Sequence, residues 1–423
     1  MRRPRPMRRR YAVGLVSALL VTLCAPATAV SAASSSGDAP APRTHSAASA
    51  PSAAGRHQVI TWGASMDRQG EGPRDRSYRA VVRTSVGGTG VRVRLSNAFG
   101  DQPVTFDSVY AGKRKEGAEL VGGSNRPLTF GGAGSVTVPP GESVVSDPLS
   151  GRLAAQSDLV VSYHVLSAGG PSTGHGMAMQ TSYATAGNHT AEESATSWTD
   201  RTGSWYYLDA VSVETDRDTG AVVALGDSIT DGWQSSTDTN RRWPDYLSRR
   251  LQSATGIGVK GVANEGISGN KVLADGAGQS ALNRLQRDVL SQPGVRTVLL
   301  FEGINDIKAH SGVTVDDMIA GYREIVERAH AAGKCVVGGT VLPFKGWSEY
   351  DPEAEAVRQG VNAFIRTSGE LDGVADFDRM LRSPYDQEKL LPVFDGGDRL
   401  HPNDKGMQAM ADAVDLKSLR CDR

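Results

Sequence analysis

The distribution of apolar and polar residues divides the chain into two parts. From about residue 57 to residue 215, short apolar runs alternate with clusters of Gly, Pro, Asn and Asp, and residues 91–95 alternate apolar with charged side chains. A period of two is typical of half-buried strands, and closely spaced turn residues are typical of antiparallel sheets. We therefore predict that residues 56–217 form an antiparallel β-sandwich domain.

After residue 216, strand-like apolar runs alternate with amphipathic helical segments. Consecutive parallel strands need crossover connections, which are usually helices that bury both faces of the sheet. We therefore predict that residues 218–423 form a three-layer α/β/α domain around a parallel five-stranded sheet. Ligands of such sheets bind at the carboxyl ends of the strands. The predicted strands are 221–225, 259–263, 295–301, 335–342 and 374–377, and the predicted helices are 242–253, 315–332, 353–367 and 405–416.

Residues 1–32 have the pattern of an export signal. Six arginines in the first ten residues precede an apolar run over residues 12–24, and small residues suited to cleavage follow. The apolar run is short for a membrane span, so we expect a secreted, extracellular protein with no stable membrane anchor. Arg8-Arg9 partly matches a twin-arginine signal, and both the Sec and the Tat export routes stay open. Residues 33–55, rich in Ala, Ser and Pro, are predicted to be a disordered linker.

The charge of the mature chain limits its partners. Removal of residues 1–32 takes away six arginines and no acidic residue, so the formal net charge falls from −1 to −7. Nucleic-acid binding needs clustered positive charge, and no basic run remains after the signal. We therefore expect no nucleic-acid partner.

Two cysteines, Cys335 and Cys421, remain after removal of the signal. In an exported protein they either form one disulfide that ties the C-terminus to the strand near Cys335, or stay as a buried Cys335 and a free Cys421. Their spacing does not match a zinc site, and no metal or organic cofactor is expected.

Two segments carry residue types suited to nucleophilic catalysis. Ser228 follows the first strand of the α/β part in the stretch Gly-Asp-Ser-Ile-Thr, and Asp398 and His401 lie three residues apart before the last helix. A serine hydroxyl needs a base within hydrogen-bond reach, and a carboxylate fixes the tautomer of a histidine base. Alone, each segment also fits an ordinary turn or a surface ion pair. His175 and His189 lie in predicted polar loops, and we assign them no role.

Two further segments follow the second and third strands of the α/β part. Asn305 comes after the third strand, where its carboxamide can donate a hydrogen bond to an oxyanion. The stretch after the second strand contains Gly266 and Gly269, where the backbone N–H can approach a ligand closely. Each of these segments also fits a plain turn.

The four segments, in the order Ser, Gly, Asn and Asp-x-x-His over residues 221–415, resemble the SGNH hydrolases, also called the GDSL esterase and lipase family. The resemblance implies a flavodoxin-like three-layer fold and a catalytic triad of Ser228, His401 and Asp398. It implies an oxyanion hole formed by the Ser228 N–H, the Gly269 N–H and Asn305. Gly269 is preferred to Gly266 because Ser-Gly before a polar residue better matches the second segment of the family. The chain as a whole is similar to exported two-domain actinobacterial members.

The resemblance leaves the substrate open, since the family includes lipases, esterases and thioesterases. We expect a secreted carboxylesterase or lipase that acts on a small-molecule or lipid ester. A carbohydrate O-acetylesterase that acts on acetylated polysaccharide is the alternative, although only 6% of the residues are aromatic. An alternative of another class is a glycan-binding or cell-wall-binding protein with a vestigial hydrolase domain. The oligomeric state and the role of the β-rich domain are not predicted.

Overall fold

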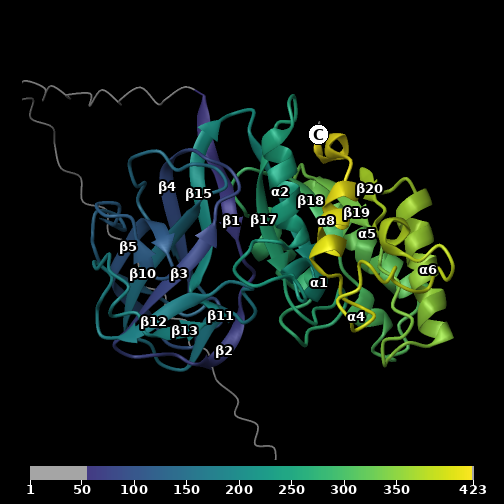
Figure 1. The fold of residues 1–423 in the computed structure, drawn as a ribbon, viewed down its shortest axis with the longest axis horizontal. Helices are drawn as coiled ribbons and strands as arrows, with labels where there is room; N and C mark the ends of the chain where they lie inside the picture. The colour runs from purple at the N-terminus through teal and green to yellow at the C-terminus, as the bar shows by residue number, and fades with distance from the viewer. Residues whose placement is uncertain (1–54, 422–423) are drawn as a thin grey trace, which may run out of the picture. The chain divides into compact units, whose positions relative to one another are not determined.

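The architecture changes once along the chain, between strands β15 (Leu208–Asp216) and β16 (Gly220–Gly226). The computed structural model describes residues 55–421. Before β16 the described chain consists of strands and loops, and after it strands alternate with helices (Figure 1). The predicted export signal and all but the last residue of the predicted linker lie outside the described residues.

The β-rich part consists of antiparallel sheets. One sheet has the order β1-β15-β4-β9, a larger one contains β13-β12-β3-β10-β5-β6 with β7 and β8 paired to β5, and a third has the order β14-β11-β2. The remaining bounds are β1 (Arg56–Gly63), β2 (Asp67–Glu71), β3 (Arg76–Arg83), β4 (Thr89–Ser96), β5 (Val104–Glu116), β6 (Glu119–Leu120), β7 (Arg126–Pro127), β8 (Val136–Val138), β9 (Ser143–Val145), β10 (Asp158–Ser167), β11 (Pro171–His175), β12 (Ser182–Ala186), β13 (Asp200–Thr202) and β14 (Trp205–Tyr206).

The alternation that predicted strands here matches the burial of their side chains. On β4, Val91, Val93 and Leu95 are buried, whereas Arg92 and Arg94 keep partial exposure. The buried side chains of the β1 sheet and of the β5 sheet belong to one hydrophobic cluster. Antiparallel strands are therefore confirmed for this part, and the sandwich arrangement stays a prediction.

The second part contains the predicted parallel sheet of five strands, which is confirmed. Its order is β17-β16-β18-β19-β20, and every neighbouring pair is parallel. β16 is central, with β17 and β18 on its two sides. The other bounds are β17 (Val259–Gly266), β18 (Val295–Phe301), β19 (Cys335–Gly339) and β20 (Gly373–Ala375).

Helices cover both faces of this sheet, as the side chains of β16 show. Val222 and Ala224 pack in a cluster with residues of α2 (Trp243–Ser253) and α8 (Asp404–Ala413). Val223 and Leu225 pack in the cluster that contains residues of α5 (Val315–Ala331) and α6 (Pro352–Thr367). The sheet is thus buried on two sides, which explains its nearly continuous apolar strands. The helices are α1 (Ser228–Asp231), α2 (Trp243–Ser253), α3 (Ala281–Arg284), a π-helix (Leu285–Leu290), α4 (Ile304–Ile307), α5 (Val315–Ala331), α6 (Pro352–Thr367), α7 (Phe377–Leu381), α8 (Asp404–Ala413) and a 3₁₀-helix (Leu416–Leu419).

Three details correct the sequence-based expectations. His175 is the last residue of β11 and is buried, so its placement in a polar loop is wrong. The segment from Ala281 to Leu290, for which no helix was predicted, is helical. The last predicted helix ends early, because Asp415 caps a separate 3₁₀-helix through a bond from the Lys417 N–H.

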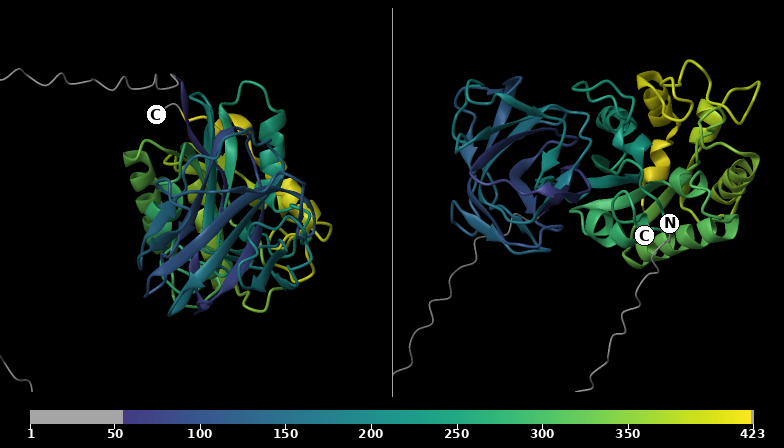
Figure 2. Two further views of the ribbon diagram at one scale, coloured as in Figure 1. Left: turned by 90° about the vertical axis from the view of Figure 1, so that its left-hand side faces the viewer. Right: turned by 90° about the horizontal axis from the view of Figure 1, so that it is seen from below.

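The C-terminal end of the described chain is tied to the sheet. Cys421 forms a disulfide with Cys335, the first residue of β19. Of the two states considered for these cysteines, the structure therefore has the disulfide and not the free Cys421. Figure 2 shows the helices and strands from two further directions. Within residues 55–421, no helix combines the length and apolar character that crossing a membrane requires.

Candidate active site

Three of the predicted segments meet at one edge of the parallel sheet. Gly226, at the end of β16, is in register with Gly266 on β17 and with Phe301 on β18. Ser228 lies two residues beyond this level, Gly269 three residues beyond it and Asn305 four residues beyond it. Since parallel strands share one carboxyl edge, the fold brings these segments together at the position where open α/β sheets bind ligands.

The turn that carries Ser228 is tightly built. A Cβ atom on Gly226 would lie 2.1 Å from the Thr230 Oγ1 and 2.5 Å from the Phe301 carbonyl oxygen, so only glycine fits there. The Asp227 carboxylate caps α1 by accepting a hydrogen bond of 3.0 Å from the Ile229 N–H. Burial raises the pKa of Asp227 to about 7.

Ser228, His401 and Asp398 form a continuous chain of hydrogen bonds. The Ser228 Oγ lies 2.8 Å from the His401 Nε2, and the His401 Nδ1 lies 2.7 Å from the Asp398 carboxylate. The same carboxylate accepts bonds from the backbone N–H groups of His401 (2.8 Å) and Leu400 (3.0 Å). A carboxylate can only accept, so Nδ1 carries a proton and Nε2 of the neutral imidazole accepts from the serine hydroxyl.

The environment favours a neutral His401 beside an ionised Asp398. Burial lowers the pKa of His401 below its ordinary value, and the opposing effect of Asp398 is smaller. Burial alone would raise the pKa of Asp398, but its hydrogen bonds from His401 and Leu400 lower the pKa below the ordinary value. This protonation state is the one in which a histidine can accept a proton from serine.

The second and third segments are in direct contact. The Asn305 side-chain amide donates one hydrogen bond of 2.9 Å to the Asn270 carbonyl, which leaves its second N–H to donate elsewhere. Gly269 precedes Asn270 and has φ +82°, a left-handed conformation that favours glycine. The Gly266 N–H already donates to the Asn264 side chain at 3.0 Å. Among residues 55–421 the Gly269 N–H has no acceptor, which favours Gly269 over Gly266 as an anion donor.

Sequence reasoning missed Arg284, whose fully buried guanidinium joins these segments. It donates to the Gly226 carbonyl at the end of β16 (2.9 Å), to the Glu265 carbonyl on β17 (2.6 Å) and to the Asn270 side chain (3.0 Å). It also donates to Glu302, the residue after β18, at 3.4 Å. No local motif marks this arginine, because its partners come from three different strand ends.

Asp306 is a second residue that stabilises the site and that was not predicted from the sequence. Its carboxylate accepts hydrogen bonds from the backbone N–H groups of Val272 (2.8 Å) and Leu273 (3.0 Å). It therefore holds the chain that follows Asn270 against α4, the helix that carries Asn305. The signal in the sequence was its place directly after Asn305, which by itself also fits an exposed helix residue.

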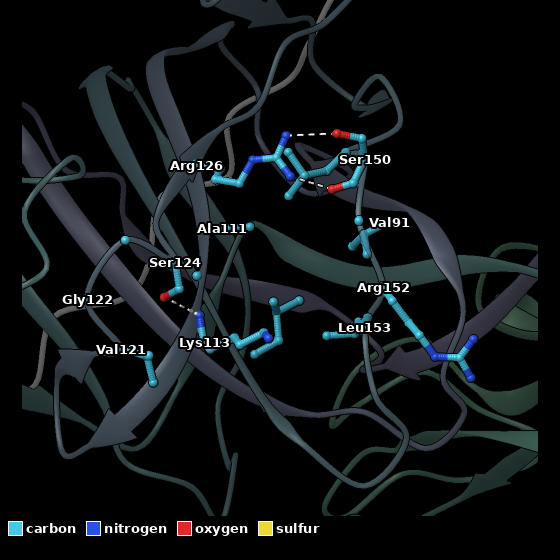
Figure 3. A pocket seen from close by; sticks show the side chains of 15 residues that line it. Val91, Ala111, Lys113, Val121, Gly122, Ser124, Arg126, Ser150, Arg152 and Leu153 are labelled. Atoms are coloured by element: carbon cyan, nitrogen blue, oxygen red, sulfur yellow. Dashed lines mark hydrogen bonds between the residues drawn. The ribbon is translucent and has the colours of Figure 1, made fainter.

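A cavity of about 400 Å³ lies elsewhere, in the β-rich part (Figure 3). Its lining includes Val91, Leu153 and Lys113, and across it the Arg126 guanidinium donates to Ser150. None of the predicted site residues and no aromatic residue lines it. Within residues 55–421 no group of three or more His, Cys, Asp or Glu side chains is arranged to hold a metal ion.

Comparison with known proteins found a family model and several similar solved structures. Residues 224–409 match the model of the GDSL-like lipase/acylhydrolase family. A search of curated proteins gave no match. Similar solved structures include a GDSL-like lipase from Bacteroides thetaiotaomicron VPI-5482, which is 22% identical, with 45% of this chain and 84% of that protein covered and a TM-score of 0.36.

Two further similar structures were found. An acetylxylan esterase from Geobacillus stearothermophilus is 23% identical, with 48% of this chain and 96% of that protein covered and a TM-score of 0.37. A member of the lipolytic protein G-D-S-L family from Veillonella parvula DSM 2008 is 21% identical, with 46% and 96% covered and a TM-score of 0.36. By the match to the family model, residues 224–409 of this chain form a GDSL-like lipase/acylhydrolase domain.

Proposed function

We propose that this chain is a secreted serine ester hydrolase with Ser228 as nucleophile, His401 as general base and Asp398 as the partner of His401. The observation that carries the proposal is the hydrogen-bond chain from the Ser228 Oγ through the imidazole to the Asp398 carboxylate, with distances of 2.8 and 2.7 Å. A serine hydroxyl becomes an effective nucleophile when such a base accepts its proton during attack.

The reaction proceeds in two acyl transfers. As the Ser228 Oγ attacks the ester carbonyl carbon, its proton passes to the His401 Nε2 and a tetrahedral intermediate forms. His401 then gives this proton to the leaving alcohol oxygen, the ester bond breaks, and the acyl group remains on Ser228. Water repeats these steps: His401 takes a proton from water, the hydroxyl oxygen attacks the acyl carbon, and the proton returns to Ser228 as the acid leaves.

The oxyanion of each intermediate is assigned three donors. These are the Ser228 N–H at the start of α1, the Gly269 N–H and the remaining side-chain N–H of Asn305. Support comes from their shared place at the carboxyl edge of the sheet and from the contact of Asn305 with the Asn270 carbonyl. Fixed donors of this kind stabilise charge that develops only in the transition state.

The pH dependence of kcat/KM should follow the ionisation of His401. The base works only as neutral imidazole, and burial lowers its pKa, so activity should fall as the pH drops below a midpoint that lies under the ordinary value of 6.5. Initial rates on a soluble short-chain ester, measured in buffers of constant ionic strength, test this. A single-proton midpoint above 6.5 would contradict the assignment of His401.

The substrate class that we favour is a carboxylic ester of a small molecule or lipid. Two observations, both on tryptophans, favour the second candidate, a carbohydrate O-acetylesterase. The Trp347 ring packs edge to face with the His401 imidazole at a centroid distance of 5.9 Å and keeps partial exposure. Trp233, whose backbone N–H donates to the Ser228 carbonyl at 2.9 Å, has a side chain that is 46% exposed. Exposed tryptophans beside a catalytic group can contact the apolar face of a ring, such as a sugar.

Hydrolysis of p-nitrophenyl esters from acetate to palmitate, together with acetylated xylan, tests the proposal. We expect turnover by the purified protein and, with an organophosphonate, a covalent adduct that peptide mass spectrometry places on Ser228. A rate maximum at long acyl chains would identify a lipase, and preference for acetylated xylan would identify the second candidate. Absence of turnover on every ester would reject the hydrolase and favour a binding protein with a vestigial site.

A further inference from the structure

One side chain of the β-rich part reaches the residues of the candidate active site. His175, at the end of β11, is buried, and its Nε2 lies 2.9 Å from the carboxylate of Asp231, the last residue of α1. Asp231 is equally buried and lies three residues after Ser228. The predicted mechanism uses neither residue.

The partners of His175 require both of its ring nitrogens to donate. Its Nδ1 lies 2.9 Å from the Ser65 carbonyl oxygen, and its Nε2 lies 2.9 Å from the Met177 carbonyl oxygen as well as from Asp231. A carbonyl oxygen accepts and cannot donate, so each nitrogen carries a proton and the ring is an imidazolium cation. Burial by itself lowers the pKa of His175, but Asp231 and the carbonyl groups raise it above its ordinary value.

The Asp231 carboxylate connects this cation to the loop that contains Gly269. Its Oδ1 faces His175, while its Oδ2 accepts hydrogen bonds from the Ser268 N–H (3.0 Å) and from the Ser268 Oγ (2.9 Å). Ser268 directly precedes Gly269. On the other side, the Asp231 N–H donates to the Asp227 carbonyl at 2.8 Å, which fixes the carboxylate to the turn of the nucleophile.

We propose that His175 is a positioning residue of the active site, whose charge holds Asp231 and, through Ser268, places the Gly269 N–H to receive the oxyanion. The inference rests on the proposed ester hydrolase. It gives the β-rich part a defined function, since the catalytic machinery is complete only with a cation supplied by β11. A charge-assisted hydrogen bond between buried groups is stronger than a neutral one and is sensitive to the loss of either partner.

The first test compares His175→Gln with the wild-type protein. Glutamine keeps a donor but loses the charge, so we expect kcat to fall about 10- to 100-fold, somewhat less than the loss of an entire oxyanion donor, while KM stays within about threefold. Asp231→Asn should have a similar effect. The double variant should be little worse than either single variant, because both changes break the same connection.

A matched control exists in the same β-rich part. His164, on β10, is also buried and also lies between carboxylates, those of Asp107 (2.6 Å) and Asp75 (3.1 Å), but both partners belong to the β-rich part. His164→Gln should lower the melting temperature and leave kcat near the wild-type value. An equal loss of kcat in both variants would show that any buried histidine change acts through stability, and would overturn the inference.

Chemical rescue provides a readout that a purely structural role would not move. A cavity of about 160 Å³ is lined by His175, Asp231 and Ser268. Removal of the imidazole in His175→Ala should enlarge this cavity, so that a small molecule can occupy the place of the ring. Added imidazole should raise the kcat of this variant at least fivefold, whereas pyrazole, of the same shape but uncharged at neutral pH, should raise it less. Equal effects of the two compounds, or no effect of imidazole, would contradict a role of the charge.

Parallel measurement of Ser228→Ala separates the two proposals. If the wild-type protein shows no Ser228-dependent ester hydrolysis, the proposed function fails. If hydrolysis depends on Ser228 while folded His175→Gln keeps its kcat, only the positioning role fails. If His175→Gln does not fold, the isosteric Asp231→Asn decides: a fall in kcat at unchanged KM supports the inference, and wild-type kcat overturns it.

Discussion

Replacement of Ser228 by alanine is expected to lower kcat on any substrate ester by about 10⁴- to 10⁶-fold while the fold stays intact. The variant loses only the Oγ atom, which in the structure bonds to the His401 Nε2 at 2.8 Å. Without it no acyl group can be held covalently, and the remaining catalysis comes from binding and from the oxyanion donors. Steady-state kinetics and the melting temperature, measured on one preparation, give both quantities.

Ser235→Ala is the matched control for this measurement. Ser235 is another buried serine of the same segment, seven residues further along, and its Oγ has no hydrogen-bond partner within residues 55–421. Its replacement should leave kcat and KM near the wild-type values. If Ser228→Ala retains more than about a tenth of the wild-type kcat, the nucleophile is a different group and the proposed reaction is wrong.

The parallel sheet was predictable from sequence because each of its strands is a separate apolar run. β18 has the bounds that were expected, and β16 and β17 extend the predicted strands 221–225 and 259–263. The helical segment from Ala281 to Leu290 was not predicted because its buried face contains an arginine as well as apolar residues. Its sequence therefore lacks the separation of apolar and polar faces that indicates an amphipathic helix.

The hydrogen-bonded group of Ser228, His401 and Asp398 was predictable for a different reason. Asp398 and His401 lie three residues apart, and the order of the four segments along the chain resembles the SGNH hydrolases, although each segment alone also fits an ordinary turn or ion pair. His175 and Arg284 carry no such local signal. Each has hydrogen-bond partners far away in sequence, as the His175–Asp231 pair shows with a separation of 56 residues, and only the folded chain reveals that both side chains are buried.

Arg284 and Glu302 are buried ionisable residues at the carboxyl ends of β16, β17 and β18, and their interactions stabilise this edge of the sheet. Burial raises the pKa of Glu302 well above its ordinary value, and the neighbouring Arg284 opposes this shift. The guanidinium meanwhile bonds to carbonyl groups at the ends of β16 and β17. Arg284 therefore supplies hydrogen bonds that these buried carbonyl groups cannot make with water, at the edge of the sheet where the proposed catalytic groups lie.

Replacement of Arg284 by methionine, which keeps much of the apolar stem, is expected to lower the free energy of unfolding by about 3–5 kcal/mol. The reason is that the Gly226 and Glu265 carbonyls, the Asn270 side chain and the Glu302 carboxyl all lose a donor while they stay buried. Urea unfolding followed by tryptophan fluorescence measures the change, provided that the slope with denaturant is unchanged.

Arg323→Met is the control for the loss of an arginine in general. Arg323 pairs with Glu370 at 2.7 Å on the surface, with more than half of its side chain exposed, so its removal should leave the urea midpoint nearly unchanged. If both variants unfold at the wild-type midpoint, the strand ends do not depend on Arg284. If Arg284→Met is destabilised as expected, its folded fraction should also show reduced kcat. The reason is that the same guanidinium holds the Asn270 side chain next to Gly269, and so links stability to the geometry of the proposed oxyanion donors.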